Sequence, residues 1–355
     1  MTKINKLIII VFCLLLVIFL YSLWVGICLP KDISGTQSQS FLVEQGESLF
    51  QISRNLEKEG IIKNKLFFIL YVAALSKQTR LQAGEYLLSP SMNIVEVADK
   101  IISGDIPREI ITIPEGWNLR DIAWYFEQRG MFLAEELFEL VGFPLVDYSE
   151  SVDLSRPKDF SDQFDFLRDK PETLSLEGYL FPDTYFVNEQ GTMNNEQYIE
   201  EIVKKMLTNF DRKLTNELRE EIRTQGKTIF EITTMASLIE KEVRGLDDKE
   251  MVSGILWKRL ENKVPLQVDA TITYITGKKT TQVSKEETEI DSPYNTYKYR
   301  ELPLGPICNP SIESIKTAIY PKESDYWYYL STPEGETIFS RTLEEHNIAK
   351  AQYLK

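Results

Sequence analysis

Histidine is almost absent from this chain of 355 residues, which contains only His346. An HExxH zinc site needs two histidines, and a Ser-His-Asp triad would have to use His346 although no GxSxG segment is present. Acid–base chemistry would therefore fall to carboxylates, and no metal or organic cofactor is indicated. His346 lies in "RTLEEHNIAK", which is typical of a C-terminal helix, and we expect it to be structural.

Cysteine and positive charge are also scarce. Cys13 and Cys28 lie in an N-terminal apolar run, which leaves Cys308 alone in the rest of the chain, so no intrachain disulfide is expected there. The formal net charge is −14 at pH 7. Nucleic acid is an improbable main partner, because binding phosphates needs a basic surface. The same charge argues against broad electrostatic attachment to anionic lipid.

One long run without charge is present, "LIIIVFCLLLVIFLYSLWVGIC" at residues 7–28. As a helix it would be about 33 Å long, enough for a bilayer core of about 30 Å. Lys3 and Lys6 precede the run, so the positive-inside rule leaves residues 1–6 in the cytoplasm. No small-x-small cleavage site follows. We therefore expect an uncleaved anchor over residues 7–29 and a single-pass plasma (inner) membrane protein whose bulk lies outside the cytoplasm.

An internal repeat follows a polar linker at residues 30–40. The segments 41–60 and 111–130 carry glycines and apolar residues at matching positions. Each copy predicts a short strand, a glycine turn and an amphipathic helix closed by a glycine. Two copies are too few for a solenoid. We therefore predict a region of α+β type over residues 41–145 with an internal repeat.

A second domain is predicted beyond residue 175. Residues 146–175 are acidic and polar with little periodicity, which indicates a linker or insertion. Residues 176–355 combine helical periodicity with dense polar loops and are expected to form a mixed domain. The predicted fold class of the whole chain is α+β.

The segment Thr233–Val243, "TTMASLIEKEV", ends in two carboxylates. On a helix Glu240 lies beside small residues such as Ala236 and Ser237, which would leave room for a ligand. Glu242 lies beside bulkier side chains. Helical periodicity therefore favours Glu240 as a working acid. The alternative is a solvated helix end with an incidental acidic pair.

Four further segments mix aromatic, polar and proline residues. Aromatic rings with amides and carboxylates are typical of sugar binding, because rings stack on sugars and amides bond hydroxyls. The structural alternative is that prolines and glycines set turns while tyrosines fill the core. Their concentration in one region favours a site. The segments are "LEGYLFPDTY" (176–185), "LQVDATITY" (266–274), "DSPYNTYKY" (291–299) and "ELPLGPICNPS" (301–311).

Together with "ASLIEKE", these segments resemble, in order, the motifs of the YceG-like endolytic murein transglycosylases (the MltG family). An N-terminal anchor followed by a LysM-like module resembles that family too, and the resemblance extends over about residues 7–350. Some positions depart from the usual motifs. Ala270 stands where proline is usual, and Glu301, Leu304 and Ser311 stand where glycine, proline and glycine are usual.

The resemblance implies a lytic transglycosylase of cell-wall biogenesis. It would cleave the MurNAc–GlcNAc bond of nascent peptidoglycan strands, leave 1,6-anhydroMurNAc ends and limit glycan elongation. Glycosyltransferases and transpeptidases of wall elongation would be partners, and residues 176–355 would be the catalytic domain. Glu240 would be the catalytic acid and base. The residues implied near the cleft are Glu177, Tyr179, Asp183, Gln267, Asp269, Tyr294, Asn295, Thr296 and Tyr297.

One carboxylate can serve both steps of this reaction, and we expect the apolar flank of Glu240 to keep it protonated. Two alternatives stay open. A glycoside hydrolase would pair Glu240 with Asp269, Glu177 or Asp183, and the separation of the carboxylates would decide the mechanism. A membrane-tethered glycan-binding scaffold would instead rely on the two repeated modules.

Overall fold

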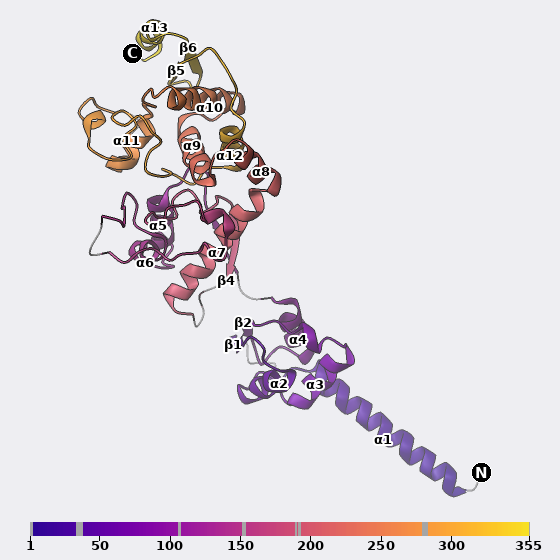
Figure 1. The fold of residues 1–355 in the computed structure, drawn as a ribbon. Helices are drawn as coiled ribbons and strands as arrows, with labels where there is room; N and C mark the ends of the chain where they lie inside the picture. Colours follow the sequence, from indigo (N-terminus) through magenta and orange to yellow (C-terminus); the bar gives the residue numbers. More distant parts are fainter. Residues whose placement is uncertain are drawn as a thin grey trace. The chain divides into compact units, whose positions relative to one another are not determined.

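The computed structural model describes residues 3–32, 38–105, 108–150, 154–188, 190, 193–278 and 283–354, without the side chains of residues 3–11, 19 and 108. It is a mixed α+β structure, mostly helical, and its described strands form three two-stranded sheets (Figure 1). The α+β class is therefore confirmed. Residue contacts divide the chain into two compact units. Unit 1 comprises Met1–Glu109 with Phe186–Thr192, and unit 2 comprises Ile110–Tyr185 with Met193–Lys355.

Unit 1 packs helices around a small antiparallel sheet, in which Gln39 pairs with Leu88. Its core contains Phe41, Leu56, Phe68 and Tyr86, all 1% exposed or less. Capping boxes begin two of its helices and satisfy the free amides of their first turns. Its elements are α1 (Lys3–Cys28), β1 (Gln39–Val43), α2 (Leu49–Lys58), α3 (Lys65–Ala74), η1 (Gln78–Arg80), β2 (Gly84–Leu88) and α4 (Ile94–Ser103).

Within the described ranges, the structure contains no helix that is both long and apolar enough to cross a membrane. The predicted tail at residues 1–6 and the first part of the predicted anchor, residues 7–11, have side chains outside the described residues. Residues 33–37 of the predicted linker also lie outside them. These three assignments stay predictions.

Unit 2 is mostly helical, and the division between the units runs through both strands of the β3–β4 sheet. A third sheet, β5–β6, is an antiparallel hairpin. The elements are β3 (Arg108–Thr112), α5 (Leu119–Gln128), α6 (Ala134–Val141), η2 (Asp165–Leu167), β4 (Thr184–Asn188), α7 (Asn195–Lys213), α8 (Asn216–Thr224), α9 (Ile229–Glu242), α10 (Leu246–Glu261), α11 (Asp269–Thr276), η3 (Glu287–Glu289), α12 (Ile312–Ile319), β5 (Tyr328–Ser331), β6 (Thr337–Ser340) and α13 (Leu343–Tyr353).

Helix α9 is the central helix of unit 2 and packs against α8, α10, α11 and α12 (Figure 1). Every residue from Ile232 to Ile239 is buried, so the helix is covered on all sides rather than on one stripe. A capping box between Thr228 and Glu231 begins it. The chain becomes extended at Val243, so the two carboxylates lie in the final turn, where the helix leaves the core.

Both copies of the repeat form the predicted strand, turn and helix. Gly46, Gly60, Gly116 and Gly130 all have positive φ, between 69° and 85°, a region that glycine enters without a steric penalty. The first copy belongs to unit 1, whereas residues 111–130 belong to unit 2 together with α9. The boundary between the units therefore falls inside the region predicted over residues 41–145.

The segment predicted as a linker or insertion contributes to the core of unit 2. Phe160 and Phe166 are each 1% exposed, and the Phe166 ring stacks on Phe210 of α7 with 4.7 Å between the ring centroids. Residues 151–153 of this segment lie outside the described residues.

Candidate active site

Glu240 is almost enclosed, with 9% of its side chain exposed. Its Oε2 accepts hydrogen bonds from the Ser311 amide at 3.0 Å, the Ser311 hydroxyl at 2.6 Å and the Ser314 hydroxyl at 2.6 Å. Lys249 Nζ lies 3.5 Å away. Burial raises the pKa of Glu240, but these hydrogen bonds and the Lys249 charge outweigh it and hold the pKa below its ordinary value. The expectation that burial keeps Glu240 protonated is therefore wrong.

The partners of Glu240 join three helices. Ser311 is the N-cap of α12, where the helix dipole favours an anion, and Lys249 comes from α10. Lys249 is only 6% exposed and also lies 3.4 Å from Glu313. The small residue Ser237 leaves no vacant space either, since its hydroxyl accepts a hydrogen bond from the Ile307 amide at 3.0 Å. Small residues on this side of α9 admit a protein loop rather than a ligand.

The turn of the second repeat copy lies against Glu240. A Cβ added at Gly116 would lie 3.5 Å from Glu240 Cγ, and Lys241 Nζ donates to the Gly116 carbonyl at 3.3 Å. Burial and the charge of Glu240 raise the pKa of Glu115 in the same turn. This contact was not predicted from the sequence. The matching Gly46 and Gly116 predicted a turn but not what it would touch.

Glu242 points to a different environment. Its Oε2 accepts a hydrogen bond from the Tyr329 hydroxyl at 2.8 Å, and its residue is partly exposed. Burial of the carboxyl raises the pKa of Glu242 to about 7, and the negative charge of Asp269 adds to the rise, while the Tyr329 hydrogen bond opposes it. The surroundings of these two carboxyls in one helical turn thus shift their pKa values in opposite directions.

Predicted cleft residues lie around Glu242. Asp269, the first residue of α11, accepts a hydrogen bond from the Tyr297 hydroxyl and interacts electrostatically with Glu242. Gln267 has a φ of +54°, a left-handed conformation that is strained for a residue with a side chain. Its amide donates to the carbonyl of the buried Thr296 at 3.0 Å. This network joins the "LQVD" and "YNTY" segments beside Glu242.

Three other predicted residues are buried within unit 2. Tyr179 is fully enclosed, with its ring centroid 5.3 Å from that of Phe210. Asn295 is fully buried and donates to the carbonyls of Thr288 at 3.0 Å and Ile290 at 2.7 Å. Tyr294 is 4% exposed. These side chains hold the shape of the loops rather than present atoms to solvent.

Glu177 is a buried connector. Its carboxyl accepts hydrogen bonds from the Leu119 amide at 3.1 Å, the Tyr274 hydroxyl at 3.0 Å and the Asn309 side chain at 3.3 Å. Burial raises the pKa of Glu177 to about 8, although the hydrogen bonds oppose this rise. Its partners come from α5, α11 and the loop before α12, so it ties these segments together.

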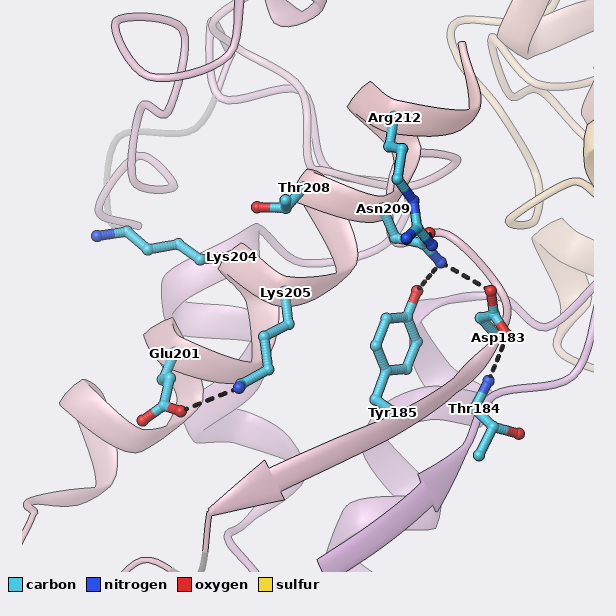
Figure 2. A pocket seen from close by; sticks show the side chains of 9 residues that line it. All are labelled: Asp183, Thr184, Tyr185, Glu201, Lys204, Lys205, Thr208, Asn209 and Arg212. Carbon is cyan, nitrogen blue, oxygen red and sulfur yellow. Dashed lines mark hydrogen bonds and ion pairs between the residues drawn. The ribbon is translucent and has the colours of Figure 1, made fainter. Parts of the chain in front are cut away.

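Asp183 lines a separate open cavity of about 430 Å³ between α7 and the start of β4 (Figure 2). Asn209 Nδ2 donates to Asp183 Oδ2 at 3.0 Å and to the Tyr185 hydroxyl at 3.1 Å. The cations on α7 are paired with neighbours; Lys205 lies 3.3 Å from Glu201, for example. Neither Glu240 nor Glu242 lines this cavity. Asp183 instead interacts electrostatically with Glu115, in the turn that lies against Glu240.

Among the described residues, no group of three or more histidine, cysteine, aspartate or glutamate side chains is placed to hold a metal ion. The arrangement around Glu242 offers a carboxyl, on a partly exposed residue, that can be protonated near neutral pH. Tyrosine side chains and a second carboxylate surround it. A group of this kind can donate a proton and later take one back.

Several known proteins are similar to this chain in sequence and fold. The profile of the YceG-like family matches residues 41–352. The endolytic murein transglycosylase of Bacillus subtilis strain 168 is 32% identical over 331 residues, covering 92% of this chain and 87% of that protein. The endolytic murein transglycosylase of Streptococcus pneumoniae strain D39 is 31% identical over 340 residues, covering 92% of this chain and 60% of that protein.

A solved structure agrees with these matches. The crystal structure of a YceG-like protein from Listeria monocytogenes is 34% identical in sequence and superposes with a TM-score of 0.53. The match covers 88% of this chain and 99% of that one. By sequence and by fold, the chain belongs to the YceG-like family.

Proposed function

We propose that this protein is an endolytic murein transglycosylase. It cleaves the bond between MurNAc and GlcNAc within glycan strands of peptidoglycan and leaves 1,6-anhydroMurNAc ends. Relatives that bear this activity in their names match over 92% of the chain. The observation that carries the proposal in this molecule is Glu242, whose carboxyl accepts a hydrogen bond from Tyr329 and whose pKa burial raises to about 7.

Glu242 acts as the acid and then as the base in the proposed mechanism. The protonated carboxyl donates to the glycosidic oxygen as the bond to the MurNAc C1 breaks, and an oxocarbenium-like centre develops at C1. The resulting carboxylate takes the proton from the C6 hydroxyl of the same sugar. That oxygen attacks C1 and closes the 1,6-anhydro ring. Water is not consumed, and the carboxyl returns to its protonated form.

Helical periodicity favoured Glu240 as the acid. The geometry favours Glu242 instead. Donation from Glu240 would first require protonating a carboxylate that three hydrogen bonds and Lys249 hold ionised. Near neutral pH about half of the Glu242 carboxyls are protonated, since the pKa of Glu242 is about 7. Glu242 also lies near Asp269 and Tyr297. Both residues belong to segments that the family resemblance implied near the cleft.

The test compares Glu242→Gln with Glu240→Gln in the full-length protein. Purified peptidoglycan is digested and its products are read by mass spectrometry. We expect wild type to release anhydro ends and Glu242→Gln to lose them by roughly a thousandfold or more, since an amide cannot transfer the proton. Folded Glu240→Gln should keep measurable activity. Loss of activity in folded Glu240→Gln with an active Glu242→Gln would return the assignment to Glu240.

The same digestion decides between transglycosylase and hydrolase. Asp269 is the second carboxylate beside Glu242, so it is the group that a two-carboxylate hydrolase would use. Digestion in ¹⁸O-labelled water would then yield reducing ends that carry the label. The proposed reaction yields anhydro ends that carry none.

We also propose that residues 7–29 anchor the protein in the plasma membrane, with residues 1–6 in the cytoplasm and the bulk of the chain outside. The uncharged run and the preceding lysines support this arrangement. It would place the enzyme beside nascent strands and beside the glycosyltransferases and transpeptidases that elongate them. External protease should degrade the protein in spheroplasts while the membrane stays intact. Complete protection under these conditions would refute this topology.

A further inference from the structure

The hairpin β5–β6 reaches the end of α9 although none of the sequence motifs includes it. The Tyr329 hydroxyl donates to Glu242 Oε2 at 2.8 Å, and the Ser331 hydroxyl donates to the Glu242 backbone carbonyl at 3.4 Å. These residues are two apart on β5, so both point to the same side of the strand. The intervening position on the other side is Leu330, which is buried.

Charged and titratable groups face Glu242 from four elements. Tyr329 comes from β5, Asp269 from α11, Arg259 from α10, and Tyr297 from the loop before residue 301. Tyr297 donates its hydroxyl to Asp269. The Arg259 guanidinium is turned to backbone carbonyls, since Nε donates to Trp327 and Nη1 donates to Leu266, both at 2.8 Å. Arg259 thus contributes its charge without a direct hydrogen bond to Glu242 in this arrangement.

We propose that Tyr329 is a positioning residue that acts on the reaction through Glu242, and that the charge of Asp269 acts on Glu242 in the opposite sense. This inference rests on the proposed function of Glu242. A hydroxyl that donates to a carboxylate stabilises the ionised form, whereas a neighbouring negative charge stabilises the protonated form. Tyr329 fixes one carboxyl oxygen of Glu242 by this hydrogen bond, and the backbone amide of Ala270 also donates to the Glu242 carboxyl.

The opposition between the two residues suits a group that must both give and take one proton. An acid that held its proton too strongly would donate poorly, and one that lost it too readily would seldom be protonated. Removing either partner should therefore displace the working pH range in opposite directions. Residues that serve only packing would not produce such paired, opposite shifts.

The experiment measures the rate of anhydro-end release against pH for full-length wild type, Tyr329→Phe and Asp269→Asn. In Tyr329→Phe the carboxylate loses a donor, so its pKa rises and the alkaline limb moves up by about one pH unit. In Asp269→Asn the negative charge is gone, so the pKa falls and the limb moves down by a similar amount.

Matched controls come from neighbouring positions. Tyr328→Phe makes the same change one residue earlier, where the ring stacks on His346 with 5.2 Å between centroids. Asp291→Asn makes the other change at an exposed carboxylate that bonds Lys298 and Tyr299. Both controls should keep the wild-type limb. Infrared titration of the Glu242 carboxyl, taken as the difference from Glu242→Gln, should give the same order of pKa values without relying on activity.

The outcomes separate the two claims. If wild type releases no anhydro ends, the proposed function fails. If wild type is active but the limb of folded Tyr329→Phe stays in place or moves down, the role of Tyr329 is refuted. A limb that also moves in Tyr328→Phe would refute it as well, because the effect would then belong to the hairpin as a whole. Asp269 is exposed at the start of α11. If Tyr329→Phe does not fold, Asp269→Asn still tests the proposed effect of the Asp269 charge on Glu242.

Discussion

Residues two apart on a helix point about 200° away from each other, so Glu240 and Glu242 meet unrelated neighbours. Glu240 meets the first turn of α12 and a buried lysine, and these groups favour its charge. Glu242 is buried and meets the negative charge of Asp269, and together these outweigh the Tyr329 hydrogen bond and disfavour its charge. Pairs of carboxyls whose surroundings drive their pKa values apart are the ones that divide into different roles. The proposed division here is between a structural anion, Glu240, and a proton donor, Glu242.

Glu240→Gln should lower the free energy of unfolding by about 2 to 3 kcal/mol at pH 7, because it leaves the buried Lys249 with only the more exposed Glu313. The pKa of Glu240 is depressed in the folded state, so its contribution is present above its ordinary value of 4.5 and is lost as the pH falls through the folded pKa. Urea unfolding should therefore show a difference between wild type and variant that shrinks on acidification below pH 4.5.

The control is Glu313→Gln, which removes the other anion near Lys249. Its carboxylate is 45% exposed, so solvent screens the pair and the loss should stay within about 1 kcal/mol. Equal losses in the free energy of unfolding for the two substitutions would show that Glu240 contributes no more to stability than the exposed Glu313.

The second residue-scale prediction concerns the pH dependence of the reaction. Because Glu242 must be protonated to donate, kcat/KM should decline above its pKa of about 7. Release of anhydro ends between pH 5 and pH 9 would locate the limb. A rate that stays level up to pH 9 would be incompatible with Glu242 as the acid.

At the scale of elements, the repeat provides matched glycine positions in the two units. Gly116 and Gly46 have φ values of +76° and +85°. A Cβ at either position meets no close backbone, so alanine should cost each turn roughly 1 to 2 kcal/mol through the left-handed conformation alone. Hydrogen exchange of α5 and of α2 would measure these local losses.

Activity should distinguish the two glycine variants. The Gly116 turn touches Glu240 and Lys241, whereas a Cβ at Gly46 would meet nothing within 4 Å. We therefore expect Gly116→Ala to slow cleavage more than Gly46→Ala does, at equal local destabilisation. Equal slowing by both would show that the turn of the second copy has no particular link to the carboxylates of α9.

Helical periodicity and glycine positions predicted α9 and the strand, turn and helix of both repeat copies, because these depend on local geometry. They could not predict which segment covers each side of α9. Ser237 meets the loop at Ile307, whose amide donates to its hydroxyl, rather than a ligand. The sequence did not indicate a role for Tyr329, because its contact with Glu242 joins residues that are far apart in sequence. The surroundings of the two glutamates therefore depend on long-range packing, which helical periodicity does not describe.

At the scale of the whole molecule, charge should govern how the enzyme meets its substrate. The chain carries a net charge of −14, and peptidoglycan strands carry the carboxylates of their stem peptides. Like charges slow encounter, and salt screens them over a Debye length of about 10 Å at 0.1 M. Raising the salt concentration from about 20 mM to about 200 mM should therefore increase kcat/KM, by roughly twofold to threefold, and leave kcat nearly unchanged.

The opposite salt response would have a structural interpretation. Helix α7 carries Lys204, Lys205 and Arg212 on the side that lines the cavity of Figure 2, although Glu200 and Glu201 pair with the two lysines. If binding depended on these cations, salt would weaken it and KM would rise. Comparing wild type with Lys205→Gln at both salt concentrations separates the cases. A rise in KM with salt that disappears in the variant would assign substrate attraction to α7, whereas the same fall in KM for both proteins would assign the effect to net charge.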